Sequence, residues 1–239
     1  MYQFDSRVRY SEVNSEKELT LPALLDYLQD CCTFQSEQLS IGVDYLAREQ
    51  VAWVLSSWEI EILRTPEFGE HISVKTWPYH FKGFYGYRNF LIEDANGEAL
   101  AKANSVWVFM DTCRMRPTRI SETITNIYDK ELGEPLAGTW SERKIVVPEG
   151  GEEKEPVQVA RFHIDTNHHM NNEKYIQVAE EYLPTGYKVN RLRAEYKKAA
   201  VLGDMLYPTV IKEDGRITVL LADEQKNPYA IVQFWEKRQ

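Results

Sequence analysis

The residues that could do chemistry gather between positions 161 and 175. This stretch reads Arg-Phe-His-Ile-Asp-Thr-Asn-His-His-Met-Asn-Asn-Glu-Lys-Tyr and holds three of the five histidines of the chain. A histidine beside a carboxylate can be held near a working pKa of about 7 and act as a general base. An asparagine both donates and accepts hydrogen bonds, so it can position a water molecule or a carbonyl group. Such a set suits hydrolysis of an activated carbonyl compound. A thioester qualifies, because its thiolate leaves with little protonation.

Three alternate residues of this stretch, Asp165, Asn167 and His169, are the predicted catalytic residues. His168 has the opposite parity, so we interpret it as structural or exposed. His163 shares the parity but lies before the polar turn, and we interpret it as structural too. A metal site built from the three histidines and Asp165 is an alternative, although the helical HxxxH and CxxC patterns of metal sites are missing. We expect neither a metal nor a cofactor. Serine-nucleophile, P-loop and dinucleotide-binding signatures are also absent from the sequence.

The elements expected around the stretch place it at the N-terminus of a helix. Residues 162–165 read as a short strand, and a helical pattern of apolar residues follows the turn: Tyr175, Ile176, Ala179, Tyr182 and Leu183. Asn171 or Asn172 is suited to cap this helix, because an amide oxygen can accept a first-turn N–H. Free N–H groups at a helix N-terminus can stabilise a developing oxyanion. We predict that this is the active site.

The first half of the chain shows the same order of strand, helix and antiparallel strands. Residues 4–10 alternate like a strand. Thr20 and Pro22 then open a helix, whose apolar residues recur every three or four positions: Leu21, Leu24, Leu25, Leu28 and Cys32. From Val51 the period is two, which predicts strands near residues 51–62, 72–76, 84–93 and 101–111, with a hairpin turn at residues 94–97.

An internal match indicates duplication. Residues 61–70 and 195–204 share a glutamate, a basic residue, an apolar residue, a glycine and an acidic residue at the same spacing, and Tyr10 lines up with Ile164. Chance similarity between two sets of antiparallel strands is the alternative. We predict an α+β protein with two copies of a helix wrapped by an antiparallel sheet. The repeats are expected at residues 1–125, which shape the substrate site, and 157–239, which catalyse. Residues 126–156 are the expected linker, and one short helix is expected within residues 121–157.

Composition narrows the class of protein. A chain of 239 residues with 43% hydrophobic residues has room for one large domain or two smaller ones. The net charge of −9 argues against a surface that binds nucleic acid. The apolar runs are shorter than the roughly 20 residues that span a bilayer, and the first residues do not resemble a signal or transit peptide. We therefore expect a cytoplasmic protein, with Cys31, Cys32 and Cys113 as reduced thiols.

The sequence also resembles a known family. The motif that carries the resemblance is Asp165-x-Asn167-x-His169-x-Asn171-Asn172-x-Lys174-Tyr175-Ile176, followed by Glu195-Tyr196-Lys197-Lys198. It is similar to that of the acyl-acyl carrier protein thioesterases of plants and bacteria. Weaker matches in the first half are Trp53-Val54-Leu55, Arg64-Thr65-Pro66, Gly69-Glu70 and Trp77-Pro78.

The resemblance implies a tandem hot-dog fold and a thioester hydrolase. Its substrate would be a fatty acyl chain linked through phosphopantetheine to acyl carrier protein. Its product would be a free fatty acid, which ends chain elongation in fatty acid biosynthesis. By position, Asp165, Asn167 and His169 are the catalytic carboxylate, amide and imidazole of the family. The implied partner is acyl carrier protein, and a homodimer is left open.

One departure from the family lies after the second motif. Plant members commonly have Glu-Cys there, with catalytic roles assigned to both, whereas this chain has Ala199-Ala200. Glu195 is a poor substitute, because four residues of strand displace it by about 13 Å. Either Asp165 and His169 activate water unaided, or another residue contributes, or the protein is slow or only binds acyl chains. An acyl-CoA thioesterase on the same fold is a further alternative.

Docking of an acidic carrier protein on this acidic chain requires local cations. The candidates are Arg191, Arg193, Lys197 and Lys198, with a second group at Arg114, Arg116 and Arg119. Strand alternation places Arg191, Arg193 and Lys197 on one face. An ordinary solvated sheet face is the alternative interpretation.

Overall fold

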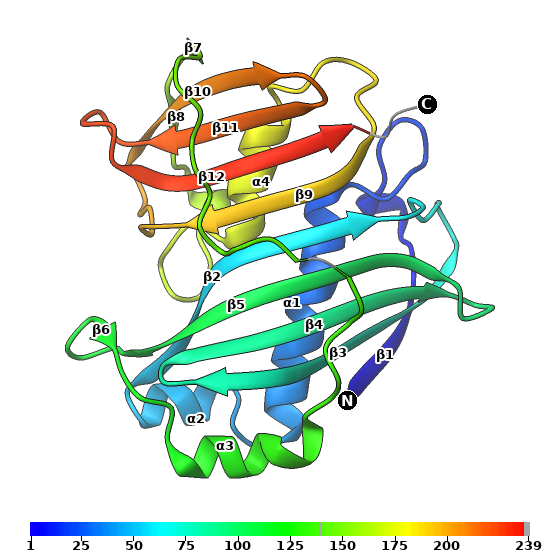
Figure 1. Ribbon diagram of the computed structural model, residues 1–239, viewed down its shortest axis with the longest axis vertical. Helices are drawn as coiled ribbons and strands as arrows, with labels where there is room; N and C mark the ends of the chain where they lie inside the picture. Colours follow the sequence, from blue (N-terminus) through cyan, green and yellow to red (C-terminus); the bar gives the residue numbers. More distant parts are fainter. Residues whose placement is uncertain (139, 237–239) are drawn as a thin grey trace. The chain divides into compact units, whose positions relative to one another are not determined.

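The computed structural model describes residues 1–138 and 140–236, and the chain divides into two compact units (Figure 1). The first unit comprises Met1–Ser56 and Ile62–Trp140, and the second comprises Ser57–Glu61 and Ser141–Gln239. The predicted division into residues 1–125, 126–156 and 157–239 stays a prediction. No helix among the described residues is long and apolar enough to cross a membrane.

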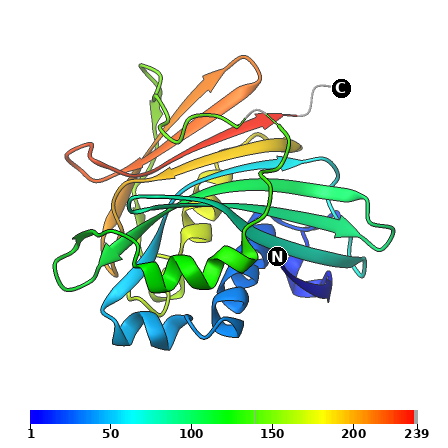
Figure 2. The same ribbon diagram turned by 60° about the horizontal axis from the view of Figure 1, so that its bottom comes forward.

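The first unit packs an antiparallel sheet against the long helix α1, Leu21–Gln38 (Figure 1). The strand order is β1-β3-β4-β5-β2. The bounds of its strands are Tyr2–Arg7 (β1), Val51–Ile62 (β2), His71–Lys82 (β3), Tyr85–Asp94 (β4), Ala99–Asp111 (β5) and Arg116–Pro117 (β6), which pairs with β5. The shorter helices are α2, Val43–Arg48, and α3, Glu122–Tyr128. Figure 2 brings α3 forward, and this helix lies within residues 121–157, where one short helix was expected.

Helix α1 forms where its sequence signals place it. The Thr20 side chain accepts a hydrogen bond from the Ala23 N–H, and Pro22 lies in the first turn. Both features are suited to a helix start, where free N–H groups need acceptors and proline loses no bond. The five predicted apolar residues are all buried: Leu21, Leu24, Leu25, Leu28 and Cys32. The predicted buried face is therefore confirmed.

The second unit repeats this plan with a shorter helix, α4, Asn172–Glu180 (Figure 1). Its main strands are Val189–Tyr196 (β9), Met205–Glu213 (β10), Arg216–Ala222 (β11) and Pro228–Glu236 (β12). The order is β9-β12-β11-β10-β7, with residues Ser57–Glu61 of β2 paired to β9. Two short strands, β7 at Glu152–Glu153 and β8 at Val157–Gln158, both pair with β10. The buried face of α4 includes Tyr175, Ile176 and Ala179, as predicted.

Matching hydrogen bonds in the two units demonstrate the repeat. In the first unit the Val8 N–H donates to the Glu70 carbonyl, and the Gly69 N–H donates to the Val8 carbonyl, both at 2.9 Å. In the second unit Val159 makes the same two bonds with Asp204 and Gly203, at 2.8 and 2.9 Å. Gly69 and Gly203 have φ of 81° and 92°, a conformation that favours glycine.

The predicted register of the repeat needs one correction. Isolated bridges join Val13 to Leu19 and Ile164 to Met170. Val13 is therefore the counterpart of Ile164, and the predicted alignment of Tyr10 with Ile164 is wrong by three residues. The Thr20 N–H donates to the Glu12 carbonyl as the Asn171 N–H donates to the His163 carbonyl, which fixes the same register.

The strand expected at residues 4–10 ends early, and the strand expected at residues 162–165 gives way to a short 3-10 helix. Strand β1 ends at Arg7, and Tyr10–Glu12 forms one turn; Arg161–His163 forms the equivalent turn where residues 162–165 were expected to be extended. The cause is a side chain that binds the backbone. Glu12 accepts the Arg9 N–H at 2.7 Å, and His163 Nδ1 accepts the Ala160 N–H at 2.9 Å. Such local bonds draw the backbone away from an extended path.

Candidate functional site

The predicted catalytic residues share one tight turn between the 3-10 helix Arg161–His163 and α4. Asp165 closes this turn: its N–H donates to the His169 carbonyl at 2.8 Å. Its carboxylate oxygen Oδ1 accepts the Asn167 N–H at 2.8 Å and the His169 N–H at 3.3 Å. The turn therefore depends on Asp165 for its shape as well as for any chemistry.

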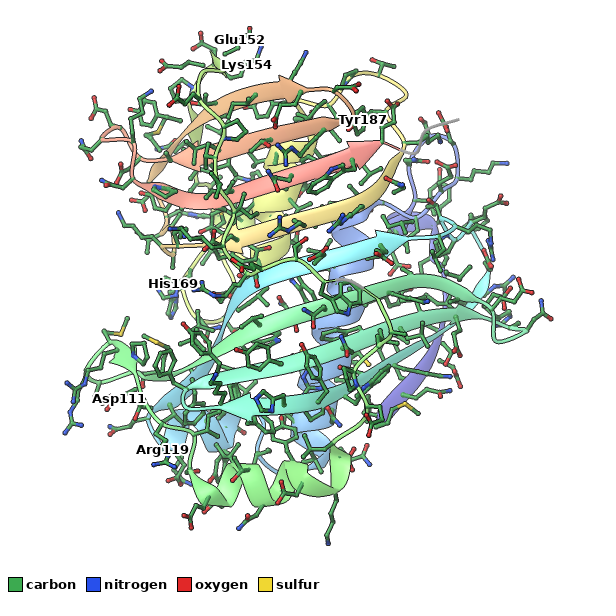
Figure 3. All side chains as sticks on the ribbon, in the orientation of Figure 1. Asp111, Arg119, Glu152, Lys154, His169 and Tyr187 are labelled. Carbon is green, nitrogen blue, oxygen red and sulfur yellow. The ribbon has the colours of Figure 1, made fainter. Side chains whose placement is uncertain are left out.

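The side chains of this turn reach solvent. Asp165 and His169 are partly exposed, and Asn167 is exposed. The Asn167 side-chain amide lies 3.5 Å from Asp165 Oδ2. Figure 3 labels His169 on the loop that precedes α4. The structure thus brings a carboxylate, an amide and an imidazole together within five residues, at a surface that substrate can reach.

The other two histidines of the stretch lie as expected: His163 is buried in the structure, and His168 is exposed. His163 is 6% exposed, and its ring accepts the Ala160 N–H while its carbonyl accepts the Asn171 N–H. Burial, together with the charge of Lys174, holds the pKa of His163 below its ordinary value. His168 is exposed and has a positive φ of 61°. Lys17, at the same position in the matching turn of the first unit, has a φ of 66°.

The start of α4 agrees only in part with the prediction. Asn171 occupies the N-cap position, but its side chain does not accept a first-turn N–H. Its backbone makes the connection instead: the N–H donates to His163, and the carbonyl accepts the Lys174 N–H at 3.0 Å.

Ala199 and Ala200 lie beside the turn that holds the candidate residues. The Met170 N–H donates to the Ala200 carbonyl, and the Ala200 N–H donates to the Tyr175 hydroxyl, both at 2.8 Å. Ala200 is fully buried, whereas Ala199 is exposed. The position where plant relatives are expected to have Glu-Cys is therefore next to the candidate residues. The sequence reading missed the hydroxyl of Tyr175, because its helical spacing indicated only a core residue. Burial raises the pKa of this hydroxyl to about 12.

Glu195 has other partners, which agrees with the expectation that it is a poor substitute for the missing carboxylate. It is fully buried and accepts the Ile145 N–H at 2.8 Å. Arg143 lies 3.5 Å from it, and Lys197 forms a second ion pair.

Three residues of the first predicted docking group, Arg191, Arg193 and Lys197, have partners within the protein. Arg191, Arg193 and Lys197 share a face, as strand alternation predicts, but Arg191 pairs with Glu59 and Lys197 with Glu195. Arg193 donates to the Glu142 carbonyl and is only 14% exposed. The segment 141–145 covers this face through backbone bonds of Ser141 and Ile145 to the same two carboxylates. The expectation of a free cationic surface here is wrong.

No group of three or more His, Cys, Asp or Glu side chains that could hold a metal ion occurs in the part of the chain that the structure describes. The alternative metal site at the histidine cluster is therefore not assembled. That catalysis needs no metal stays a prediction. The three cysteines are free thiols, with Cys31 and Cys32 buried and Cys113 exposed.

Comparisons with known proteins agree over most of the chain. The family model of the acyl-ACP thioesterase N-terminal domain matches residues 1–128, and that of the C-terminal domain matches residues 148–233. Oleoyl-acyl carrier protein thioesterase 1 of Arabidopsis thaliana, a chloroplastic protein, is 25% identical over 192 residues, which are 74% of this chain and 53% of that protein. The palmitoyl-acyl carrier protein thioesterase of the same plant is 21% identical over 80% of this chain and 50% of its own length. The chain thus spans about half the length of these relatives.

Solved structures give the fold. A Bacteroides thetaiotaomicron acyl-ACP thioesterase superposes with a TM-score of 0.88 at 21% identity, covering 98% of this chain and 97% of its own. The 12:0-ACP thioesterase of Umbellularia californica superposes with a TM-score of 0.87 at 16% identity, covering 100% and 97%. The predicted tandem hot-dog fold is confirmed.

The buried His163 predicts a stability that depends on pH. Its pKa is lowered on folding, so the unfolded chain binds more protons as the pH falls through about 6.5. The free energy of unfolding should therefore decrease on acidification from above that value toward the lowered pKa. Denaturant melts between about pH 7.5 and 5 should show a steeper loss for the native chain than for His163→Gln. The exposed His71→Gln is the control and should follow the native slope. Equal slopes for all three proteins would contradict the assignment.

Proposed function

Since the chain belongs to the acyl-ACP thioesterase family, we propose that it hydrolyses the thioester of a fatty acyl-acyl carrier protein. The products are the free fatty acid and the carrier protein with a free phosphopantetheine thiol, so the reaction ends chain elongation in fatty acid biosynthesis. The observation that carries the proposal is the turn that holds Asp165, Asn167 and His169 beside the end of β9, in a chain matched by both domain models of the family.

The proposed chemistry begins with His169 as general base. The imidazole takes a proton from water, and the resulting hydroxide attacks the thioester carbonyl. The tetrahedral oxyanion then expels the thiolate, which is a good leaving group and needs little protonation. Asn167 positions the water or the carbonyl oxygen. Asp165 either orients the imidazole or attacks the carbonyl itself, and both roles require its negative charge.

The alanines at 199 and 200 constrain this mechanism. They lie next to the turn, where a Glu-Cys pair would add a second base or a thiol. We propose that Asp165 and His169 perform the activation without them. The buried Glu195 is held by Arg143, Lys197 and the Ile145 N–H, so it is not available as a replacement.

The proposed partner is acyl carrier protein, and no nucleic acid takes part. A cytoplasmic location stays a prediction of the sequence, and the homodimer stays open.

A hydrolysis panel tests the function. The native chain should release free thiol from acyl carrier protein thioesters faster than from CoA thioesters of the same acyl chain, as measured by thiol titration over several chain lengths. Faster turnover of the CoA thioesters would favour an acyl-CoA thioesterase. Binding of acyl chains with no turnover of either thioester would instead indicate an acyl-binding protein, the interpretation that Ala199-Ala200 raises.

Removal of the base should abolish most activity. We expect His169→Ala to lower kcat by about 10²–10⁴-fold, the usual loss for a general base. Circular dichroism melts should remain native, because the His169 bonds within the turn are made by its backbone. His168→Ala removes a neighbouring exposed imidazole and should retain activity. A larger loss in His168→Ala than in His169→Ala would refute the assignment.

The first unit supplies a control for the role of the Asp165 charge. Asn14 closes the matching turn with an amide oxygen, which accepts the Glu16 and Glu18 N–H groups at 2.9 and 3.0 Å. Asp165→Asn should therefore keep the turn, with a melting temperature within about 2 °C of native, but lower kcat at least about a hundredfold. Asn14→Asp should leave activity unchanged. If Asp165→Asn stays active, the carboxylate acts only as a structural acceptor.

A further inference from the structure

Large apolar side chains are exposed beside the candidate site. Phe162 is 73% exposed, Leu202 56% and Val201 42%, whereas most other large apolar side chains of the second unit are buried. With the exposed Arg161, they form what we call the rim patch: Arg161, Phe162, Val201 and Leu202. Exposed apolar side chains that gather near a functional site often mark a surface that binds another protein.

The backbone connects the rim patch to the catalytic turn. Val201 follows Ala200, whose carbonyl accepts the N–H of Met170, the residue after His169. On the other side, the ring of Phe162 lies 4.1 Å from that of His163, whose carbonyl accepts the Asn171 N–H. The rim patch therefore borders the turn from both of its ends.

The repeat shows that the two halves of the patch adjoin. In the first unit Tyr10 and Phe68 are in contact, with ring centroids 5.9 Å apart. The Val159 bonds to Gly203 and Asp204 match the Val8 bonds to Gly69 and Glu70, so Arg161 and Leu202 are the counterparts of Tyr10 and Phe68. Arg161 and Leu202 thus share one surface. The counterpart pair in the first unit lacks the predicted catalytic residues and serves as an internal control.

The charges around the patch favour an acidic partner. Arg161 is exposed, and Lys198, 56% exposed, stands on the ring of Tyr229. The nearest carboxylate in sequence, Asp204, is turned toward the protein, where it accepts the Val201 N–H at 3.0 Å and the Tyr229 hydroxyl at 3.1 Å. Asp223 lies 3.7 Å from the Lys198 ammonium, which partly offsets that charge.

We propose that the rim patch is the docking surface for the acyl carrier protein. This proposal rests on the proposed function. Phe162 and Leu202 would pack against apolar side chains of the carrier protein, and Arg161 and Lys198 would pair with its carboxylates. Apolar anchors at the centre with charges at the edge are the ordinary anatomy of such an interface. The rim patch takes the place of the docking surface first predicted on the strand face of Arg191 and Arg193, because segment 141–145 covers that face.

The test compares two equivalent substitutions. Leu202→Glu places a carboxylate in the rim patch, and Phe68→Glu places one at the matching exposed position of the first unit. We expect Leu202→Glu to raise KM for an acyl carrier protein thioester about tenfold, as loss of an interface anchor does. Hydrolysis of a small acyl-pantetheine thioester should change less than about twofold, because that substrate does not need the patch. Phe68→Glu should behave as the native chain with both substrates.

A binding measurement separates this proposal from the proposed function. An acyl carrier protein carrying an amide-linked, non-hydrolysable acyl chain is titrated into His169→Ala, alone and combined with Leu202→Glu or Arg161→Glu. Both additions should weaken binding, and the effect of Arg161→Glu should shrink in high salt. Unchanged binding, or equal weakening by Phe68→Glu, would overturn the docking surface even if the chain is a thioesterase. Binding that depends on the patch without any hydrolysis would overturn only the proposed activity.

Discussion

The turn that holds the candidate residues depends on Ala200, which lies in the loop that follows β9. Its carbonyl accepts the Met170 N–H and its N–H donates to the Tyr175 hydroxyl, so a single peptide segment joins the turn, helix α4 and the end of β9. Ala200 is fully buried, and a buried backbone group left without a partner costs about 1–3 kcal/mol. The segment therefore has little freedom to move, which holds His169 at a constant place relative to α4. Both hydrogen bonds are made by the backbone of Ala200, so they do not depend on the chemistry of its side chain.

The two buried carboxylates of the second unit also have hydrogen-bond partners from a neighbouring segment. Glu59 and Glu195 are buried carboxylates, and each accepts a backbone N–H from segment 141–145 in addition to its ion pairs. Buried charges are tolerated only when they are paired and hydrogen-bonded. The connecting segment thus completes the partners of two carboxylates, and its place on the strand face follows from that need. Arg191 and Arg193 take part in the same arrangement, because both lie within ion-pair distance of Glu59.

Most helices and strands of the fold could be predicted from the sequence, because they follow the periodicity of its apolar residues. The helix at Leu21–Gln38, the antiparallel strands and the repeat all arise from burial on one face, which spacing reveals. The 3-10 helices at Tyr10–Glu12 and Arg161–His163 could not be predicted in this way, since each depends on a side chain that binds a nearby N–H. The covering of the strand face was also missed, because residues 141–145 have no periodic pattern. The candidate residues were found from their types and spacing, but the bond from Tyr175 to Ala200 joins positions that no spacing rule connects.

The two matching turns also bear on how the protein could have changed over evolution. Asn14 and Asp165 close the same backbone turn, and His169 has Glu18 as its counterpart, placed by the same bonds. The turn needs an acceptor oxygen at this position, which an amide supplies as well as a carboxylate, so its backbone does not depend on the negative charge or on the imidazole. After duplication, either copy could lose or gain an acid and an imidazole by substitutions at two positions, with no rearrangement of the backbone. The two turns differ in their side chains and not in their backbone hydrogen bonds, so a change in the reactive groups that a turn carries requires few mutational steps.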